Sequence, residues 1–291
     1  DATTELIENY IDGNLEGLGI SGDDLPWAKR ERIGRIVDYV AGRNRYVGYL
    51  ISLASNSYKK LRIGIDCANG ASWSIAKSVF AALGAQVEVI GDEPDGLNVN
   101  RDCGSTHIEN LCHLVREKHL DIGFAFDGDA DRCLAVDENG NLVDGDKIMV
   151  ICAKGLKDEG KLKNNTVVAT VMSNLGFFKA LDKIGINYEQ TTVGDRYVLQ
   201  NMLENGHIIG GEQSGHVILL ENNTTGDGLV TALTVASTAA KSKKKLSELA
   251  GVVTVLPQVL VNVTVKNEHK NTYSSDSVIK SEIEKLEKKF D

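Results

Sequence analysis

The chain has 291 residues, a length that favours two or more domains over one compact core. Its net charge of −9, without a stripe of lysine and arginine, argues against broad nucleic-acid binding, which needs phosphate neutralisation. No apolar run reaches membrane-spanning length, and five scattered cysteines without a C-x-x-C pair indicate reduced thiols in a cytoplasmic protein rather than a disulfide framework or a zinc site.

The N-terminal part of the chain has too few apolar residues for a core of its own. Residues 3–12 have the periodicity of one amphipathic helix, and the Gly- and Asp-rich residues 13–28 indicate a loop. A second helical pattern covers residues 29–58, and Gly42 is expected to break it into two helices. Because the chain also starts with aspartate rather than methionine, we expect a fragment or a processed form, in which residues 1–45 are the tail of a preceding domain and a connector.

A strand–helix–strand unit begins at Leu61, and such units imply a parallel sheet with right-handed crossovers. The fingerprint G-x-G-x-x-G is absent from its first turn, which argues against a dinucleotide site. We assign residues 46–147 to one α/β domain. Its expected elements are strands at residues 61–66, 86–90, 122–126 and 133–136 and helices at residues 72–83 and 110–118.

A second α/β domain at residues 148–256 repeats this architecture. Residues 257–291 add a strand at 259–265 and a helix at 276–289, too little for a domain, so we expect the start of an incomplete further domain. The basic cluster Lys241 to Lys245 is interpreted as a solvated helix end rather than a phosphate site. The fold class is therefore α/β, with two consecutive α/β domains whose mixed, mainly parallel sheets carry helices on their faces. The expected elements of residues 148–256 are strands at 166–171, 186–190, 207–209 and 217–220 and helices at 147–156, 174–184, 197–203 and 228–240.

Three aspartates, Asp127, Asp129 and Asp131, directly follow an apolar strand and precede Arg132. Two unit charges ~4 Å apart repel by about 4 kcal/mol at an effective dielectric of ~20, so the loop needs a cation. Carboxylate oxygens favour a hard ion, Mg²⁺ or Ca²⁺, over zinc. A helix–loop–helix calcium site is disfavoured because Arg132 stands where that loop needs glycine, and a plain polar turn leaves the charge unpaired. We favour a Mg²⁺ site with open positions for a phosphate oxygen and with Arg132 as a phosphate partner.

A Gly-rich heptapeptide, Gly210 to His216, is the second candidate site. Its glycines let the backbone approach a ligand closely, and Glu212 with Ser214 supplies the carboxylate and hydroxyl that typically bind sugar hydroxyls. His216 can bind phosphate or move a proton near neutral pH, although a purely structural histidine is equally open. Arg196, at the expected start of a helix, is a phosphate contact or a member of a structural salt bridge.

These residues resemble a known family. Residues Asp127 to Arg132 resemble the metal loop of the α-D-phosphohexomutase superfamily, and Gly210 to His216 resemble its sugar-binding loop. Gln213 is typical of bacterial members that act on glucosamine phosphate, since relatives acting on mannose or glucose phosphates usually have methionine there. Further similar stretches lie at residues 66–71, 96–100, 103–107, 171–174, 193–198 and 225–229.

The resemblance implies four domains around one cleft and an isomerase that interconverts glucosamine 6-phosphate and glucosamine 1-phosphate. The reaction would pass through a phosphoserine and a bisphosphate, on the route to UDP-N-acetylglucosamine and the cell wall. The resemblance also implies Mg²⁺ on the three aspartates, a phosphate held by Arg132, sugar hydroxyls held by Glu212 and Ser214, and His216 near the reacting phosphate.

Two loops of the family are missing from this sequence, the serine loop and the Arg-x-Ser-Gly-Thr-Glu loop. We therefore expect a central fragment that is inactive alone. Another hexose-phosphate mutase and a non-catalytic protein that binds Mg²⁺ or sugar phosphate are the alternatives. The sequence leaves open whether the protein forms a homodimer.

Overall fold

The computed structural model describes residues 2–14, 28–35, 37–54, 56–270 and 272–290. The chain divides into two units, residues 1–46 and residues 47–291. In the first unit the predicted N-terminal helix is confirmed as α1 (Ala2–Ile11), followed by a short 3₁₀ turn, η1 (Arg30–Arg32). Most of the loop expected at residues 13–28 lies outside the described residues.

The prediction that Gly42 ends a helix is wrong. Helix α2 (Val40–Leu53) runs through Gly42, because a glycine inside a helix costs only about 1 kcal/mol relative to alanine and packing can offset that cost. In the C-terminal half of α2, Leu50 is fully buried. The hydroxyl of Tyr49 also donates a 2.5 Å hydrogen bond to the carbonyl of Asn222.

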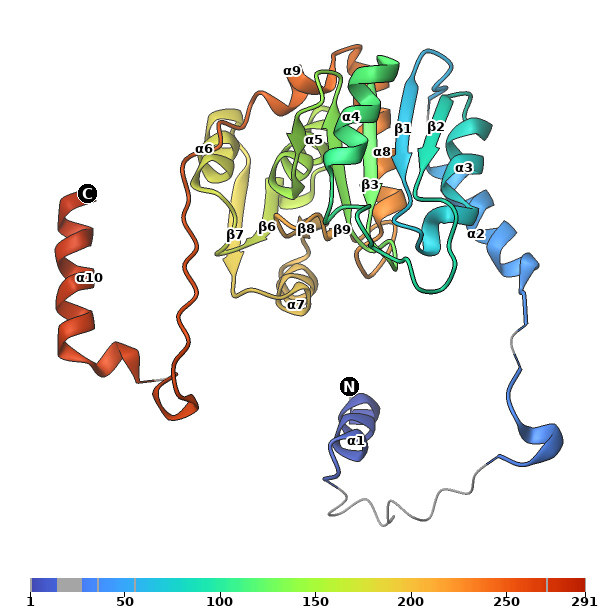
Figure 1. Ribbon diagram of the computed structural model, residues 1–291. Helices are drawn as coiled ribbons and strands as arrows, with labels where there is room; N and C mark the ends of the chain where they lie inside the picture. The colour runs from blue at the N-terminus through green and yellow to red at the C-terminus, as the bar shows by residue number, and fades with distance from the viewer. Residues whose placement is uncertain (1, 15–27, 36, 55, 271, 291) are drawn as a thin grey trace. The chain divides into compact units, whose positions relative to one another are not determined.

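The first sheet of residues 47–291 has five strands in the order β2-β1-β3-β4-β5, and Figure 1 shows β2, β1 and β3 side by side. Strand β1 pairs in parallel with β2 and β3, and β4 is antiparallel to both β3 and β5. Helix α4 covers the face that carries Ala125 and Val136, whereas Gly228 of α8 lies against Phe126 on the opposite face. The elements are β1 (Arg62–Asp66), η2 (Ala71–Ser74), α3 (Ala76–Ala82), β2 (Gln86–Ile90), α4 (Glu109–Lys118), β3 (Ile122–Phe126), β4 (Cys133–Asp137) and β5 (Leu142–Val143).

The second sheet has four strands in the order β7-β6-β8-β9 and repeats the plan of the first. Strand β6 is parallel to β7 and β8, and β9 is antiparallel to β8. Helices α5 and α8 pack against strands of both sheets. This arrangement confirms the expected α/β class with two consecutive α/β domains. The elements are α5 (Gly145–Asp158), η3 (Lys163–Asn165), β6 (Thr166–Thr170), α6 (Leu175–Ile184), β7 (Asn187–Thr191), α7 (Asp195–Asn205), β8 (Ile209–Gly211), β9 (Val217–Leu219) and α8 (Gly228–Ser242).

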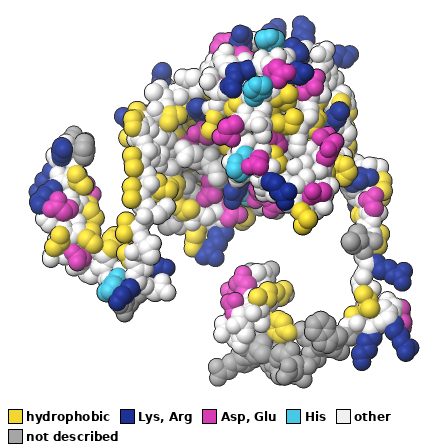
Figure 2. Space-filling model, viewed as in Figure 1, with side chains coloured by type: hydrophobic (Ala, Val, Ile, Leu, Met, Phe, Trp, Pro, Cys, Tyr) yellow, Lys and Arg dark blue, Asp and Glu magenta, His cyan; other side chains and the backbone are white. Residues whose placement is uncertain are grey.

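The predicted strand at residues 259–265 does not form. Residues 252–266 belong to no helix or strand, and the apolar side chains from Val259 to Val265 are exposed (Figure 2). A strand needs a neighbour to accept its backbone hydrogen bonds, and no described strand lies beside this segment. The predicted C-terminal helix is confirmed as α10 (Ser277–Phe290), preceded by the short turns η4 (Asn267–His269) and η5 (Tyr273–Ser275).

Two smaller differences concern helices. The single helix expected at residues 72–83 is a 3₁₀ turn followed by α3, and α9 (Leu246–Ala250), with only five residues, was not predicted. Among the described residues, no helix is long and apolar enough to cross a membrane.

Candidate active site

The aspartate loop, residues 127–132, follows the carboxyl end of β3, the end at which ligands bind in α/β sheets. Two neighbouring segments fix its backbone. The amide of Ala71 donates a 2.8 Å hydrogen bond to the carbonyl of Gly128, and the amide of Gly228 donates a 2.9 Å bond to the carbonyl of Ala130. Ala130 has φ +63°, a left-handed conformation that this tight turn requires. The loop is therefore shaped by contacts with the start of α8 and with the turn after β1.

The three carboxylates converge. Asp127, Asp129 and Asp131 each offer an oxygen, and these oxygens lie within 4.8 Å of one another. Burial, together with the negative charges of Asp131 and Asp129, raises the pKa of Asp127 to about 6. The backbone amide of Arg132 donates a 3.1 Å hydrogen bond to Asp127 Oδ1, and its Nε lies 4.0 Å from Asp127 Oδ2. One arginine does not neutralise three carboxylates, so this all-oxygen set fits a hard divalent cation such as Mg²⁺.

The Gly-rich loop, residues 210–216, lies directly beside the aspartate loop. Cys133 donates a 3.0 Å backbone hydrogen bond to the carbonyl of Gly215, and Arg132 and His216 form an antiparallel bridge. Gly215 has φ +96°, and a Cβ there would lie 2.5 Å from the carbonyl oxygen of Cys133. Glycine is thus required at this close approach. The bridge brings the two predicted loops, more than 70 residues apart in sequence, into one site.

His216 connects the two loops through its side chain. The residue is 5% exposed, and its Nδ1 lies 3.0 Å from Asp131 Oδ2. Its Nε2 accepts a 3.2 Å hydrogen bond from the amide of Gly226 and lies 3.7 Å from Asp195 Oδ2. A neutral ring whose Nε2 accepts carries its proton on Nδ1, which then donates to Asp131. This geometry favours a role in holding Asp131, and the predicted contact with a reacting phosphate stays a prediction.

The other predicted site residues differ in their surroundings. Glu212 Oε1 accepts a 3.0 Å hydrogen bond from the amide of Gly194, which ties the Gly-rich loop to the start of α7. Ser214 is exposed at the tip of the turn. Arg196 is exposed as well, with its guanidinium 4.6 Å from the ring centre of Tyr197 and a 2.6 Å hydrogen bond to that hydroxyl. Their roles toward a sugar or a phosphate stay predictions.

Sequence analysis did not assign a role to Asp146, which is 1% exposed at the start of α5. Its Oδ2 accepts hydrogen bonds from the amide of Asn174 (2.8 Å) and from Gln213 Nε2 (3.2 Å). Burial raises the pKa of Asp146 to about 6. Asp146 therefore positions the Gly-rich loop through its hydrogen bond with Gln213. No sequence motif indicates this contact, because it joins residues 67 positions apart.

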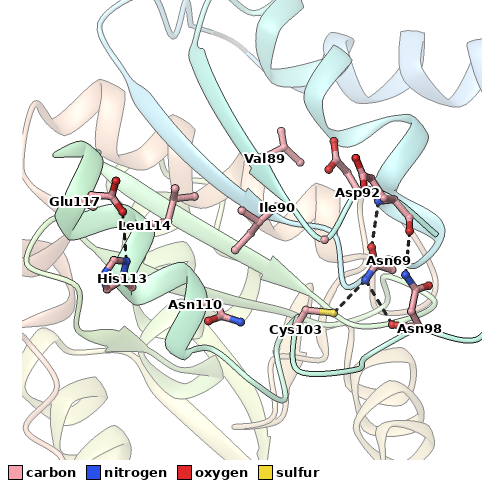
Figure 3. Close-up of a pocket in the computed structure, with 12 residues that line it drawn as sticks. Asn69, Val89, Ile90, Asp92, Asn98, Cys103, Asn110, His113, Leu114 and Glu117 are labelled. Carbon is pink, nitrogen blue, oxygen red and sulfur yellow. Dashed lines mark hydrogen bonds and ion pairs between the residues drawn. The ribbon is translucent and has the colours of Figure 1, made fainter. Parts of the chain in front are cut away.

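A separate hollow of about 650 Å³ lies at the carboxyl ends of β1 and β2 (Figure 3). Asn69 lies at one side of the hollow and donates hydrogen bonds to the carbonyl of Asn98 and to Cys103 Sγ. The Asn69 side-chain oxygen accepts from the amide of Glu93. Protein groups satisfy the side-chain amide of Asn69, so this residue stabilises the local backbone. No candidate site residue lines the hollow.

Two domain families match the sequence. Residues 44–140 match the family described as phosphoglucomutase/phosphomannomutase, alpha/beta/alpha domain II, and residues 144–255 match domain III of the same description. Among curated relatives, a phosphoglucosamine mutase of Lachnospira eligens is 53% identical over 278 residues, which cover 96% of this chain and 60% of the relative. One of Acetivibrio thermocellus is 53% identical over 290 residues, 100% of this chain and 63% of the relative. The chain thus spans about 60% of the length of these relatives.

Solved structures have the same fold. A phosphoglucomutase/phosphomannomutase family protein of Burkholderia thailandensis is similar with a TM-score of 0.64 at 24% identity, over 74% of this chain and 47% of that chain. An N-acetylphosphoglucosamine mutase of Aspergillus fumigatus, in complex with GlcNAc-6P and magnesium, has a TM-score of 0.59 at 18% identity, over 74% and 50% of the two chains. At these identities the likeness concerns the fold alone.

Proposed function

The chain belongs to the phosphoglucomutase/phosphomannomutase family, and we propose that it supplies the metal-binding and sugar-binding domains of a phosphoglucosamine mutase. The substrate would be glucosamine phosphate, interconverted between its 6-phosphate and 1-phosphate forms. Relatives named phosphoglucosamine mutase at 50–53% identity over nearly the whole chain support this substrate. The resemblance of the Gly-rich loop at Gln213, where family members acting on glucose or mannose phosphates usually have methionine, favours the same substrate.

The aspartate loop would hold Mg²⁺ through Asp127, Asp129 and Asp131, whose oxygens already lie within 4.8 Å of one another. When bound, the ion would neutralise charge on the phosphoryl group in transfer. Arg132, beside Asp127, would bind the same phosphate through its guanidinium. Phosphoryl transfer depends mainly on positioning and charge neutralisation. The three aspartates with their cation and Arg132 would supply both at the transferred phosphate.

The Gly-rich loop would position the sugar. Glu212 would accept hydrogen bonds from sugar hydroxyls while its Oε1 stays fixed by the amide of Gly194. The exposed hydroxyl of Ser214 would bind a second hydroxyl of the ring, and Arg196 would contact a phosphate of the substrate. A sugar held in either of two orientations presents O6 or O1 to the same phosphoryl group, which is what the interconversion requires.

The single observation that carries the proposal is the 3.0 Å contact between His216 Nδ1 and Asp131 Oδ2. It couples the sugar loop to the metal loop through one buried ring, so that sugar and cation are held at a fixed spacing. A protein with unrelated metal and sugar sites has no need for such a coupling.

Mg²⁺ titration of the 291-residue chain by calorimetry tests the metal site. Wild type should bind one Mg²⁺, weakly, because water must complete the coordination. Asp129→Asn should bind it at least tenfold more weakly, since a charged ligand is lost. The matched control is Asp182→Asn, which makes the same charge change at an exposed position of α6. Equal Mg²⁺ affinity in all three proteins would contradict the metal site.

A further inference from the structure

A second concavity lies at the opposite end of the first sheet from the aspartate loop. It has a volume of about 770 Å³ and is bordered by the segments before β1 and β3 and by the end of α8. In Figure 1 this is the end at which α9 lies, whereas the loops after β3 and before α8 lie at the other. Strand β3, five residues or about 16 Å long, separates the two ends. We name this concavity the lysine groove.

The rim of the lysine groove is basic. It combines lysines that are almost 200 residues apart in sequence, together with His119 at the end of α4. All of these side chains are exposed. No lysine of the rim forms an ion pair within 4.0 Å with another residue that the structure describes. The lysines are Lys59, Lys60, Lys243, Lys244 and Lys245.

Two carboxylates also line the lysine groove, and protein groups already bind both. Asp121 Oδ2 accepts a 2.7 Å hydrogen bond from the amide of Arg62. Glu138 accepts hydrogen bonds from the hydroxyl (2.5 Å) and the amide (3.2 Å) of Ser247. Five lysines against two carboxylates leave the rim strongly positive in a protein whose net charge is −9. Such a local reversal of sign attracts an anion.

The walls of the lysine groove are apolar. Leu120, Ile122, Ala239 and Leu246 form its buried backing, and the apolar surface open to a ligand comes from the half-buried Leu61 and Ala240 and from the aliphatic stems of the rim lysines. A volume of 770 Å³ falls within the ~300–1,000 Å³ of small-molecule sites. Helix-end stabilisation explains Lys243 to Lys245 at the C-terminus of α8, but Lys59 and Lys60 lie outside any helix and are not explained by it. An apolar wall under a rim of lysines suits a ligand with a flat apolar ring at one end and phosphates at the other.

We propose that the lysine groove binds a nucleoside diphosphate or triphosphate, with its base against the apolar wall and its phosphates on the lysines. The site is separate from the one proposed for the sugar phosphate and uses none of its residues. Its occupancy does not depend on Mg²⁺ bound to the aspartate loop.

UDP titrated into the 291-residue chain in the presence of EDTA tests the proposal by calorimetry. Wild type should bind UDP, and the double variant Lys59→Gln/Lys244→Gln, with one lysine changed on each side, should bind roughly tenfold more weakly. Lys179→Gln/Lys183→Gln, on the exposed face of α6, carries the same charge change and should bind as wild type does. Higher salt should weaken the binding because exposed charges are screened.

Uridine and inorganic phosphate are the ligand controls. Both should bind much more weakly than UDP, because each satisfies only one half of the lysine groove. Three outcomes would each overturn the assignment. They are the absence of UDP binding by wild type at millimolar concentration, equal UDP affinity of the two double variants, and an affinity for inorganic phosphate that matches the affinity for UDP. Since all measurements omit Mg²⁺, their outcome is independent of the proposed mutase activity.

Discussion

Replacing His216 with alanine removes the one side chain that hydrogen-bonds both Asp131 and the amide of Gly226. Asp131 then loses its orienting partner, and removal of such a partner typically weakens metal binding 10–100-fold. We therefore expect the Mg²⁺ affinity of the chain to fall by about 1.4–2.7 kcal/mol. The amide of Gly226 is also left buried without an acceptor, which lowers the free energy of unfolding by about 1–3 kcal/mol.

Two further variants separate these effects. The amide of asparagine reaches the position of Nδ1, so His216→Asn keeps the contact with Asp131 and should keep most of the Mg²⁺ affinity. Glutamine reaches the position of Nε2, so His216→Gln keeps an acceptor for Gly226 and should recover stability without recovering Mg²⁺ affinity. Calorimetry for Mg²⁺ and urea denaturation measure the two quantities on the same preparations.

His207 provides the matched control. It is 4% exposed, and its Nε2 lies 3.0 Å from Glu189 Oε1, so its burial and its carboxylate partner match those of His216. His207→Ala should lose stability and keep wild-type Mg²⁺ affinity, because Glu189 is no metal ligand. The reasoning is refuted if folded His216→Ala binds Mg²⁺ as tightly as wild type does, or if His207→Ala weakens Mg²⁺ binding equally.

Three other outcomes are expected. Glu212→Ala in the full-length enzyme should lose most turnover and keep its fold, whereas Glu221→Ala, at an exposed ion pair, should stay within a few-fold of wild type. Since burial raises the pKa of Asp146 to about 6, its contribution to stability is full below its ordinary pKa near 3.8 and is lost as the pH rises through 6. Between pH 4 and pH 7, the free energy of unfolding of Asp146→Asn, measured by urea denaturation, should therefore rise by up to about 3 kcal/mol relative to wild type. Parallel pH profiles of the two proteins would contradict this. The 291 residues alone should unfold cooperatively and yet not convert glucosamine 6-phosphate with Mg²⁺ and hexose bisphosphate, and turnover above background would show a misplaced catalytic group.

The sequence predicted the sheets well because each central strand is a short apolar run between turn residues. Central strand β3 is buried along its whole length and has the bounds expected for it, and the aspartate loop follows it as expected. Residues buried on both faces must be apolar throughout, and that pattern is local. The strand expected at residues 259–265 has the same local pattern but fails, because a strand also requires a partner, and the sequence does not name one.

The contacts that complete the site were not predictable from local pattern. The hydrogen bond between His216 and Asp131 spans 85 residues, and the one between Gln213 and Asp146 spans 67. The lysine groove likewise joins Lys59, to which the sequence assigned no role, to Lys244, which belongs to the cluster interpreted as a solvated helix end. Periodicity reports which face of an element is buried, whereas these contacts depend on how the two sheets pack through α5 and α8.

The sugar specificity of the full-length enzyme tests the central claim most directly. Turnover of glucosamine 6-phosphate, glucose 6-phosphate and mannose 6-phosphate should be compared for wild type and for Gln213→Met, with Mg²⁺ and the matching hexose bisphosphate present. The account predicts that wild type has by far the highest kcat/KM for glucosamine 6-phosphate and that Gln213→Met reduces this preference. A wild-type enzyme that prefers glucose or mannose phosphate, or that converts none of the three sugars, would contradict it.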